Sequence, residues 1–122
     1  MPIVDVEVVC DPAAPPEIGT AQRIADEVGR RLAAPKGSTW VRLRWLAADA
    51  YAENEAAVGA DELPVFALVL HKQPPQGSEL EAQVVNVTQA IALALQRSPE
   101  RVHVQYAPPA AGRQAFGGQL VR

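Results

Sequence analysis

Two segments of the chain carry the same order of features, and this repeat limits the possible folds more than any other property. Each segment begins with an apolar, partly alternating run that contains a proline at its second position, Met1–Val9 in the first and Leu63–His71 in the second. A Pro-Pro pair, a helical pattern and a further strand pattern follow in both. Strand, helix and strand in that order form a β-α-β unit with parallel strands and a right-handed crossover. We therefore predict an α+β fold with a duplicated β-α-β unit, over about residues 2–46 and 64–107.

The spacing of apolar residues predicts the elements of each unit. Strands are expected over about residues 3–9, 39–46, 64–71 and 102–106. Apolar residues three and four apart predict a first helix that begins near Pro16, with the stripe Ile18, Ala21, Ala25, Val28 and Leu32. The second helix is expected to begin at the capping box Ser78-Glu79-Leu80-Glu81. Its stripe comprises Leu80, Val84, Val87, Ile91 and Leu95.

Together these elements predict one four-stranded mixed sheet with both helices packed on one face. The second face is then left without a helix. On the second strand Val41, Leu43 and Trp45 share one side, whereas Trp40 and the two arginines at positions 42 and 44 share the other. Because a sheet face that mixes Trp, Arg and apolar residues is a plausible contact surface, we predict that this face is an interface between subunits.

Length and composition indicate a single small domain spanning residues 1–122 and exclude several classes of protein. Hydrophobic residues make up 48% of the chain, which is enough to build a core and argues against disorder. The single Cys10 cannot form an internal disulfide and fits a reducing cytoplasm. The net charge of −3 argues against nucleic-acid binding. With no apolar stretch long enough to cross a bilayer, we expect a cytoplasmic protein that does not bind membranes.

Pro2 is the residue with the most distinctive potential chemistry. If Met1 is an initiator residue that is removed, Pro2 becomes an N-terminal secondary amine held at a sheet edge, at the start of a strand. The pKa of an α-amino group is about 7.7–8.0, and apolar surroundings or nearby cations lower it. The neutral amine is then available near pH 7 as a general base and, once protonated, as an acid. Pro64, its equivalent in the second unit, has an amide nitrogen and cannot act in this way.

These features resemble the tautomerase superfamily, which includes 4-oxalocrotonate tautomerase, macrophage migration inhibitory factor, and several decarboxylases and dehalogenases. The resemblance rests on Pro2 at the start of a strand, the doubled β-α-β unit and the predicted hairpin Ala115-Phe116-Gly117-Gly118. Two local runs are also similar, Leu32–Lys36 before the second strand and Ser98–Val102 before the fourth, the latter especially to the migration-inhibitory-factor branch. The resemblance implies a homotrimer with active sites between adjacent subunits.

The resemblance also implies roles for individual residues. Pro2 would be the catalytic base and then acid, and Lys36 would lie beside it. Arg42 would bind substrate from a neighbouring subunit. His103 and Gln105 stand where the migration-inhibitory-factor branch has a Tyr and an Asn.

Two aromatic residues, Trp40 and Phe116, are expected to wall the pocket. Structural alternatives stay open for the charged candidates. Arg42 and Arg44 could pair with acidic residues of the first strand, Asp5 and Glu7. Lys36 could be a solvated loop residue, and His103 a hydrogen-bonded interface residue.

The sequence thus predicts an isomerase, a keto–enol tautomerase that needs no cofactor and acts on a small anionic 2-oxo acid or enol. We expect no metal site, because His71 and His103 lack the spacing of metal ligands. A decarboxylase, hydratase or dehalogenase is the first alternative, and it would need a carboxylate near Pro2, for which Asp5, Glu7 and Asp49 are the candidates. It would also need an Arg pair, and where the similar decarboxylases and dehalogenases have one this chain has His71-Lys72-Gln73. A non-enzymatic trimeric binding protein is the second alternative. The sequence assigns no role to Arg44, Arg113 or Asp49.

Overall fold

The computed structural model describes all residues, 1–122, and its main sheet has four strands. These strands are β1 (Ile3–Cys10), β2 (Trp40–Ala47), β3 (Val65–Leu70) and β4 (Val102–Tyr106). Their order across the sheet is β2-β1-β3-β4. β1 runs parallel to β2 and β3 runs parallel to β4, whereas the two central strands β1 and β3 are antiparallel. The predicted mixed sheet and the duplicated β-α-β unit are confirmed.

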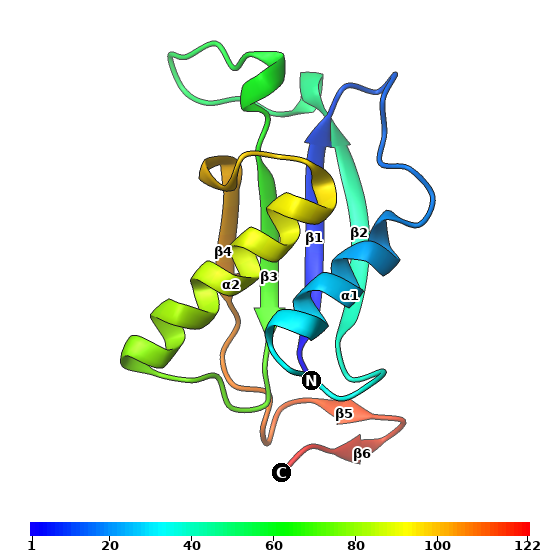
Figure 1. Cartoon of the computed structure of the whole chain (residues 1–122), viewed down its shortest axis with the longest axis vertical. Coiled ribbons are helices and arrows are strands. Elements are labelled where there is room, and N and C mark those ends of the chain that lie inside the picture. Colours follow the sequence, from blue (N-terminus) through cyan, green and yellow to red (C-terminus); the bar gives the residue numbers. More distant parts are fainter.

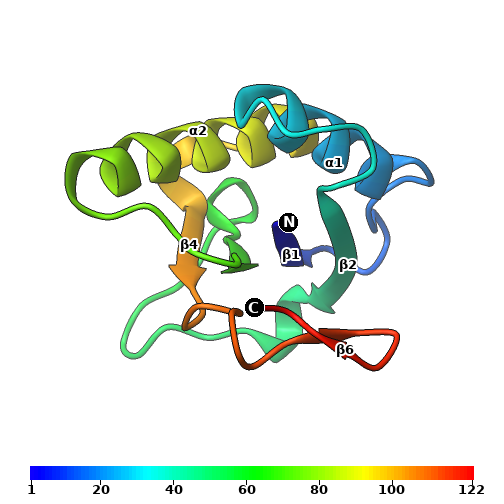
Figure 2. The same ribbon diagram turned by 90° about the horizontal axis from the view of Figure 1, so that it is seen from below.

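Both long helices lie on the same face of this sheet (Figure 1, Figure 2). They are α1 (Thr20–Arg31) and α2 (Gly77–Leu95). A small hairpin of β5 (Ala115–Phe116) and β6 (Gln119–Leu120) follows β4 and lies at the same end of the molecule as the N-terminus (Figure 1). Single turns of 3₁₀ helix occupy Ala48–Ala50, Ala60–Glu62 and Pro99–Arg101. Neither α1 nor α2 combines the length and apolarity that a bilayer-crossing helix needs.

The core lies between the sheet and the helices. Alternate residues of β1 and β3 point into it, because successive side chains of a strand face opposite sides of the sheet. Ile24 and Val28 of α1 and Val87 and Ile91 of α2 are fully buried against them. The strand residues of this core are Val4, Val6, Val8, Cys10, Val65, Ala67, Val69 and Val102.

The beginnings of both helices differ from the prediction. Ile18 is fully exposed and lies before α1, which begins at Thr20, so its place in the buried stripe was wrong. The residue that fills the core instead is Ile24. The predicted capping box is also absent, because α2 begins at Gly77 and no side chain caps its N-terminus. Apolar periodicity and a four-residue motif locate a helix but do not fix its first turn.

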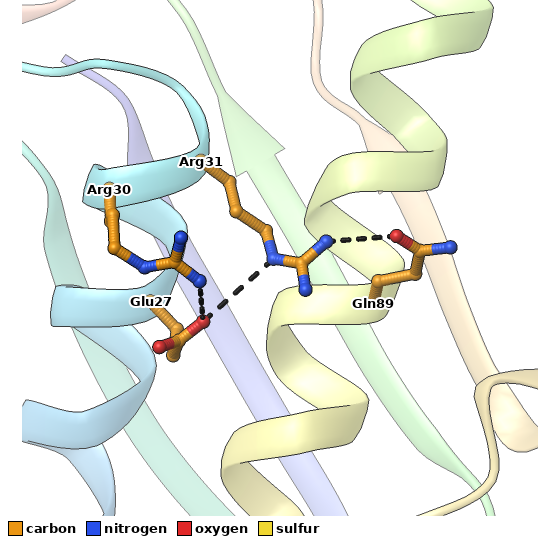
Figure 3. Close-up of polar contacts among 4 residues, drawn as sticks. All are labelled: Glu27, Arg30, Arg31 and Gln89. Atoms are coloured by element: carbon orange, nitrogen blue, oxygen red, sulfur yellow. Dashed lines mark hydrogen bonds and ion pairs between the residues drawn. The ribbon is translucent and has the colours of Figure 1, made fainter.

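The two helices are joined by polar contacts on their outer surface (Figure 3). Arg31 of α1 donates a hydrogen bond of 2.8 Å to the Oε1 atom of Gln89 on α2. Arg30 forms an ion pair of 2.8 Å with Glu27 one turn earlier in α1. These exposed contacts add little stability on their own, but the bond from Arg31 links the two β-α-β units across the helical layer.

The opposite face of the sheet carries no helix and exposes large apolar side chains. Phe66 and Leu68 of the central strand β3 are 38% and 39% exposed there, and Trp40 of β2 is 52% exposed. We call this surface the open face. It is the face that the sequence predicted as a subunit interface.

Candidate active site

Pro2 precedes β1 and is fully buried. The sequence analysis expected Pro2 at a sheet edge. β1 is instead an interior strand, so the chain start lies at the end of the sheet between two neighbouring strands. The backbone N–H of Trp40 donates a hydrogen bond of 3.0 Å to the Pro2 carbonyl oxygen. That bond continues the parallel ladder between β1 and β2 and fixes Pro2 relative to β2.

The register of the sheet defines the neighbours of Pro2. The parallel pairing of Ile3 with Trp40 places Thr39 beside Pro2 on the β2 side. The antiparallel pairing of Ile3 with Leu70 places His71 beside it on the β3 side. Sequence reasoning considered His71 only as a metal ligand and as a replacement for an arginine. The strand register that brings it to Pro2 cannot be read from local sequence patterns.

A small cavity of about 250 Å³ opens at this end of the sheet. Its lining is formed by Met1, Ile3, Gly37, Ser38, Trp40 and Phe116. Trp40 and Phe116 meet edge to face with ring centroids 5.2 Å apart. The indole N–H of Trp40 donates a hydrogen bond of 2.9 Å to the Gly37 carbonyl oxygen, which fixes the ring at the mouth of the cavity. Two of the predicted pocket residues therefore meet at the chain start.

Lys36 lies in the loop between α1 and β2, next to Gly37 in the cavity wall. Its side chain is exposed and makes no ion pair or hydrogen bond within the chain. Gly37 adopts a φ of +75°, a left-handed conformation that glycine accepts without strain, and this turn brings the loop to the start of β2. The structure thus places Lys36 close in sequence to the cavity without assigning it a contact there.

Arg42 points to the open face and is already paired. Its guanidinium donates hydrogen bonds to both carboxylate oxygens of Asp5 on β1, the one from Nη2 at 2.8 Å. Hydrogen bonding from Arg42 lowers the pKa of the Asp5 carboxyl group, because it stabilises the ionised form. Within one subunit, Arg42 therefore makes the structural pair that the sequence analysis left open as an alternative.

His103 and Gln105 also lie on the open face, on β4. They line a hollow of about 450 Å³ together with Glu7, Arg44 and Phe66. The imidazole ring of His103 is 5.7 Å from the ring of Phe66, centroid to centroid. The candidate residues thus form two groups within the subunit. Pro2, Trp40 and Phe116 lie at the end of the sheet where the chain begins, whereas Arg42, His103 and Gln105 lie further along the strands on the open face.

The opposite end of the sheet holds a larger hollow, about 800 Å³, but it lies away from Pro2. It is lined by the last residues of β1, including Cys10, and by charged side chains of both signs, among them Arg23, Asp26 and Arg97. Burial raises the pKa of the Cys10 thiol, which keeps it protonated and unreactive. Asp49 follows β2 at this same end, so within the subunit it is not beside Pro2. No three His, Cys, Asp or Glu side chains group as metal ligands.

No family model matches the sequence, and no curated protein matches it. Solved structures do match the chain. Pt0534 inactivated by 2-oxo-3-pentynoate matches with a TM-score of 0.73 at 17% identity, over 97% of this chain and 95% of that one. Macrophage migration inhibitory factor from Oncomelania hupensis matches with a TM-score of 0.70 at 21% identity, over 100% and 83%. FG41 malonate semialdehyde decarboxylase inhibited by 3-bromopropiolate matches with a TM-score of 0.62 at 14% identity, over 94% and 90%.

At these identities the comparisons establish a common fold. The chain shares the fold of these proteins, and the resemblance seen in the sequence is confirmed at the level of the fold. Because proteins of one fold carry out different reactions, the activity must be argued from the site.

Proposed function

We propose that the chain is a cofactor-independent keto–enol tautomerase that acts on a small anionic 2-oxo acid or enol through the amine of Pro2. The observation that carries the proposal is the position of Pro2, buried at the start of an interior strand beside a cavity walled by Trp40 and Phe116. The proposal requires that Met1 is removed, which exposes the secondary amine to this cavity.

Tautomerisation moves one proton between oxygen and carbon, and a single amine can perform both transfers. The neutral amine of Pro2 accepts the proton from the enol oxygen, and the resulting ammonium returns a proton to carbon. A cation or hydrogen-bond donor must hold the negative charge that develops on oxygen. Lys36 is our candidate on the same subunit, since it adjoins the cavity wall at Gly37.

We further propose that the chain is a single domain that assembles as a homotrimer through the open face. Two of the similar structures are described as trimers of fused 4-OT. The exposed Phe66 and Leu68 provide apolar surface for such a contact. Assembly is also a way to bring Arg42, His103 and Gln105 of one subunit to the Pro2 cavity of another. Arg42 would then exchange Asp5 for a substrate carboxylate, which an arginine binds in bidentate fashion.

The deciding experiment is the ketonisation of a phenylpyruvate-type enol or a simple dienol by the wild type and by Pro2→Ala. Intact mass must first show that Met1 is absent from both. We expect saturable activity in the wild type and a loss of at least about 100-fold in the variant, the usual contribution of a general base. Pro64→Ala is the matched control, because Pro64 holds the equivalent position in the second unit but has an amide nitrogen. It should keep wild-type activity.

Once Met1 is removed, Pro2→Ala still carries a primary α-amine, so equal activity of the two proteins would refute a requirement for the secondary amine of Pro2. The structural likeness to a malonate semialdehyde decarboxylase makes decarboxylation and hydration the next reactions to assay. That alternative is weakened within the subunit by the position of Asp49 at the other end of the sheet. Retention of Met1 would favour a binding protein without this chemistry.

A further inference from the structure

We propose that His71 is a positioning residue for the Pro2 amine, and that the two groups form an electrostatically coupled pair. This inference rests on the proposed function for its catalytic meaning. The evidence for the pair itself comes from the register of the sheet and from the burial of both residues.

The register makes Pro2 and His71 direct cross-strand neighbours. Ile3 pairs with Leu70 at the end of the ladder, and the same register continued by one residue places Pro2 opposite His71. Odd-numbered residues of β1 form the hydrogen-bonded pairs with β3, as the bond from the Val9 N–H to the Pro64 carbonyl oxygen shows. Pro2 and His71 therefore form a pair without hydrogen bonds, the type whose Cα atoms approach to about 4.5 Å and whose side chains lie closest.

The two side chains also share one face. Val4 and Val69 are buried beneath the helices, and the pleat places residues two positions further along on the same side. Pro2 is two residues before Val4 and His71 is two residues after Val69. Pro2 is fully buried and His71 half-buried, so both side chains are at least partly shielded from water on this face.

The backbone of His71 is fixed on its other side. Its carbonyl oxygen accepts a hydrogen bond of 2.9 Å from the backbone N–H of Ala110, a residue that is itself buried. This bond ties the end of β3 to the segment that leads to the C-terminal hairpin. The backbone of His71 is thus held by this bond and follows directly on the last paired residue of β3.

Burial and one nearby charge determine the pKa of His71. Burial lowers the pKa of the imidazole, and the positive charge of the N-terminal ammonium, which Met1 carries in this structure, lowers it further. Removal of Met1 moves this charge to Pro2. No carboxylate or other cation, whether on β2, the helices, Lys72 or the segment after β4, contributes to this shift. A coupling of this kind is reciprocal, so a charged imidazole must equally disfavour a protonated amine. When the pair holds a single proton, that proton therefore lies on the amine and not on the imidazole.

The pairing has a consequence for catalysis. The proton that the amine gains and returns stays on Pro2, because the neighbouring imidazole is the weaker base. Below the pH at which His71 titrates, both groups become cationic. Such a site attracts an anionic substrate more strongly but holds no neutral amine to act as base. We therefore expect KM and kcat to fall together in that range in the wild type.

The test is an NMR titration of the mature protein, labelled so that the imidazole of His71 and the ring of Pro2 are observed. It is compared with a form in which an N-terminal extension of several residues moves the ammonium away from Pro2. All side chains remain in place in both forms, and His103 provides a reference resonance in the same spectra. We expect the midpoint of His71 to rise by about one pH unit in the extended form, as like charges on adjacent strands predict.

The reciprocal experiment uses His71→Gln, a neutral side chain of similar size, and His71→Arg, a permanent cation. The Pro2 resonance of the wild type should show a second, small inflection at the midpoint of His71, and His71→Gln should lack it. His71→Arg should move the Pro2 midpoint downward by about one pH unit. An unchanged His71 midpoint after extension, or an unchanged Pro2 titration in both variants, would overturn the proposal. Since neither readout needs turnover, a failure here is distinct from a failure of the tautomerase proposal.

Discussion

The side chain of Arg97 supplies a hydrogen bond that Pro64, which has no N–H, cannot donate to the sheet. The strength of this bond allows a quantitative prediction. The N–H of Val9 at the end of β1 donates to the Pro64 carbonyl oxygen at 3.1 Å. In a complete antiparallel pair the opposite residue would return a bond to the Val9 carbonyl oxygen, but proline has no N–H. Arg97, directly after α2, donates to that oxygen at 3.0 Å and to the Leu63 carbonyl oxygen at 2.8 Å. Burial lowers the pKa of its guanidinium, which reflects the cost of placing it there.

Arg97→Met retains much of the apolar stem and removes both donors. A buried acceptor left without a donor costs about 1–3 kcal/mol, so two carbonyls give an upper limit of about 6 kcal/mol. Arg97 is only half-buried, and water replaces part of what is lost. We therefore expect the free energy of unfolding to fall by about 2–3 kcal/mol. Because Arg97 and Pro2 lie at opposite ends of β1, kcat/KM should be unchanged under conditions where the protein stays folded.

A double-mutant cycle with Pro64→Ala tests the reasoning itself. The Pro64→Ala substitution supplies the missing N–H to the Val9 carbonyl oxygen, so it should recover about 1 kcal/mol of the loss in the Arg97→Met background. Its own effect includes up to about 1 kcal/mol from the freer unfolded chain, and the cycle cancels this term. Urea unfolding at one fixed protein concentration measures all four proteins, since an oligomer is stabilised by its own concentration. Additive losses, or a loss below about 0.5 kcal/mol for Arg97→Met, would refute the account.

Three further predictions follow from single features of the structure. The edge-to-face contact of Trp40 and Phe116 should give a coupling of about 0.5–1.5 kcal/mol in a cycle of alanine variants, measured by thermal unfolding. Gln96 ends α2 in the left-handed region at φ 55°, so Gln96→Gly should raise stability by about 0.5–1 kcal/mol, whereas Leu95→Gly within the helix should lower it. The pKa of Asp5 is lowered in the folded protein by Arg42. The contribution of Asp5 to stability is therefore present above its unfolded pKa of about 3.9 and is lost as the pH falls through the lowered value. Asp5→Asn should reduce this loss of stability at acid pH, measured by unfolding titrations.

The repeat of strand, helix and strand was enough to predict most of the fold, because the crossover of a β-α-β unit is almost always right-handed. The alternation in β1 and the stripe through Val28 and Ile91 correctly placed the core beneath the helices. Helix starts were less predictable. Ile18 fits the helical period as well as Ile24 does, but it precedes a glycine in the left-handed conformation, after which α1 begins. The spacing of apolar residues does not predict such a local backbone conformation.

The site was predictable only where its residues lie on elements with readable patterns. Pro2, Trp40 and Phe116 were named from strand starts and a glycine-containing hairpin, and the structure brings all three to one end of the sheet. The neighbour His71 was missed, because it depends on the antiparallel register between β1 and β3. That register joins residues far apart in the chain, and single-sequence patterns do not encode it.

Asp5 and Arg42 pose a choice that one substitution can decide. Arg42 has a single guanidinium, and in the subunit both of its oxygen partners belong to Asp5. If Arg42 also binds the substrate carboxylate, the two carboxylates compete for the same donors. Asp5→Asn removes the competing charge at nearly constant shape, so KM should fall while kcat changes little. If Arg42 serves only the sheet, the same variant should leave KM unchanged and weaken the fold or the assembly instead, and Arg42→Gln should do likewise. A lower KM in Asp5→Asn together with a higher KM in Arg42→Gln would therefore assign Arg42 to substrate binding, because no purely structural role moves KM in opposite directions.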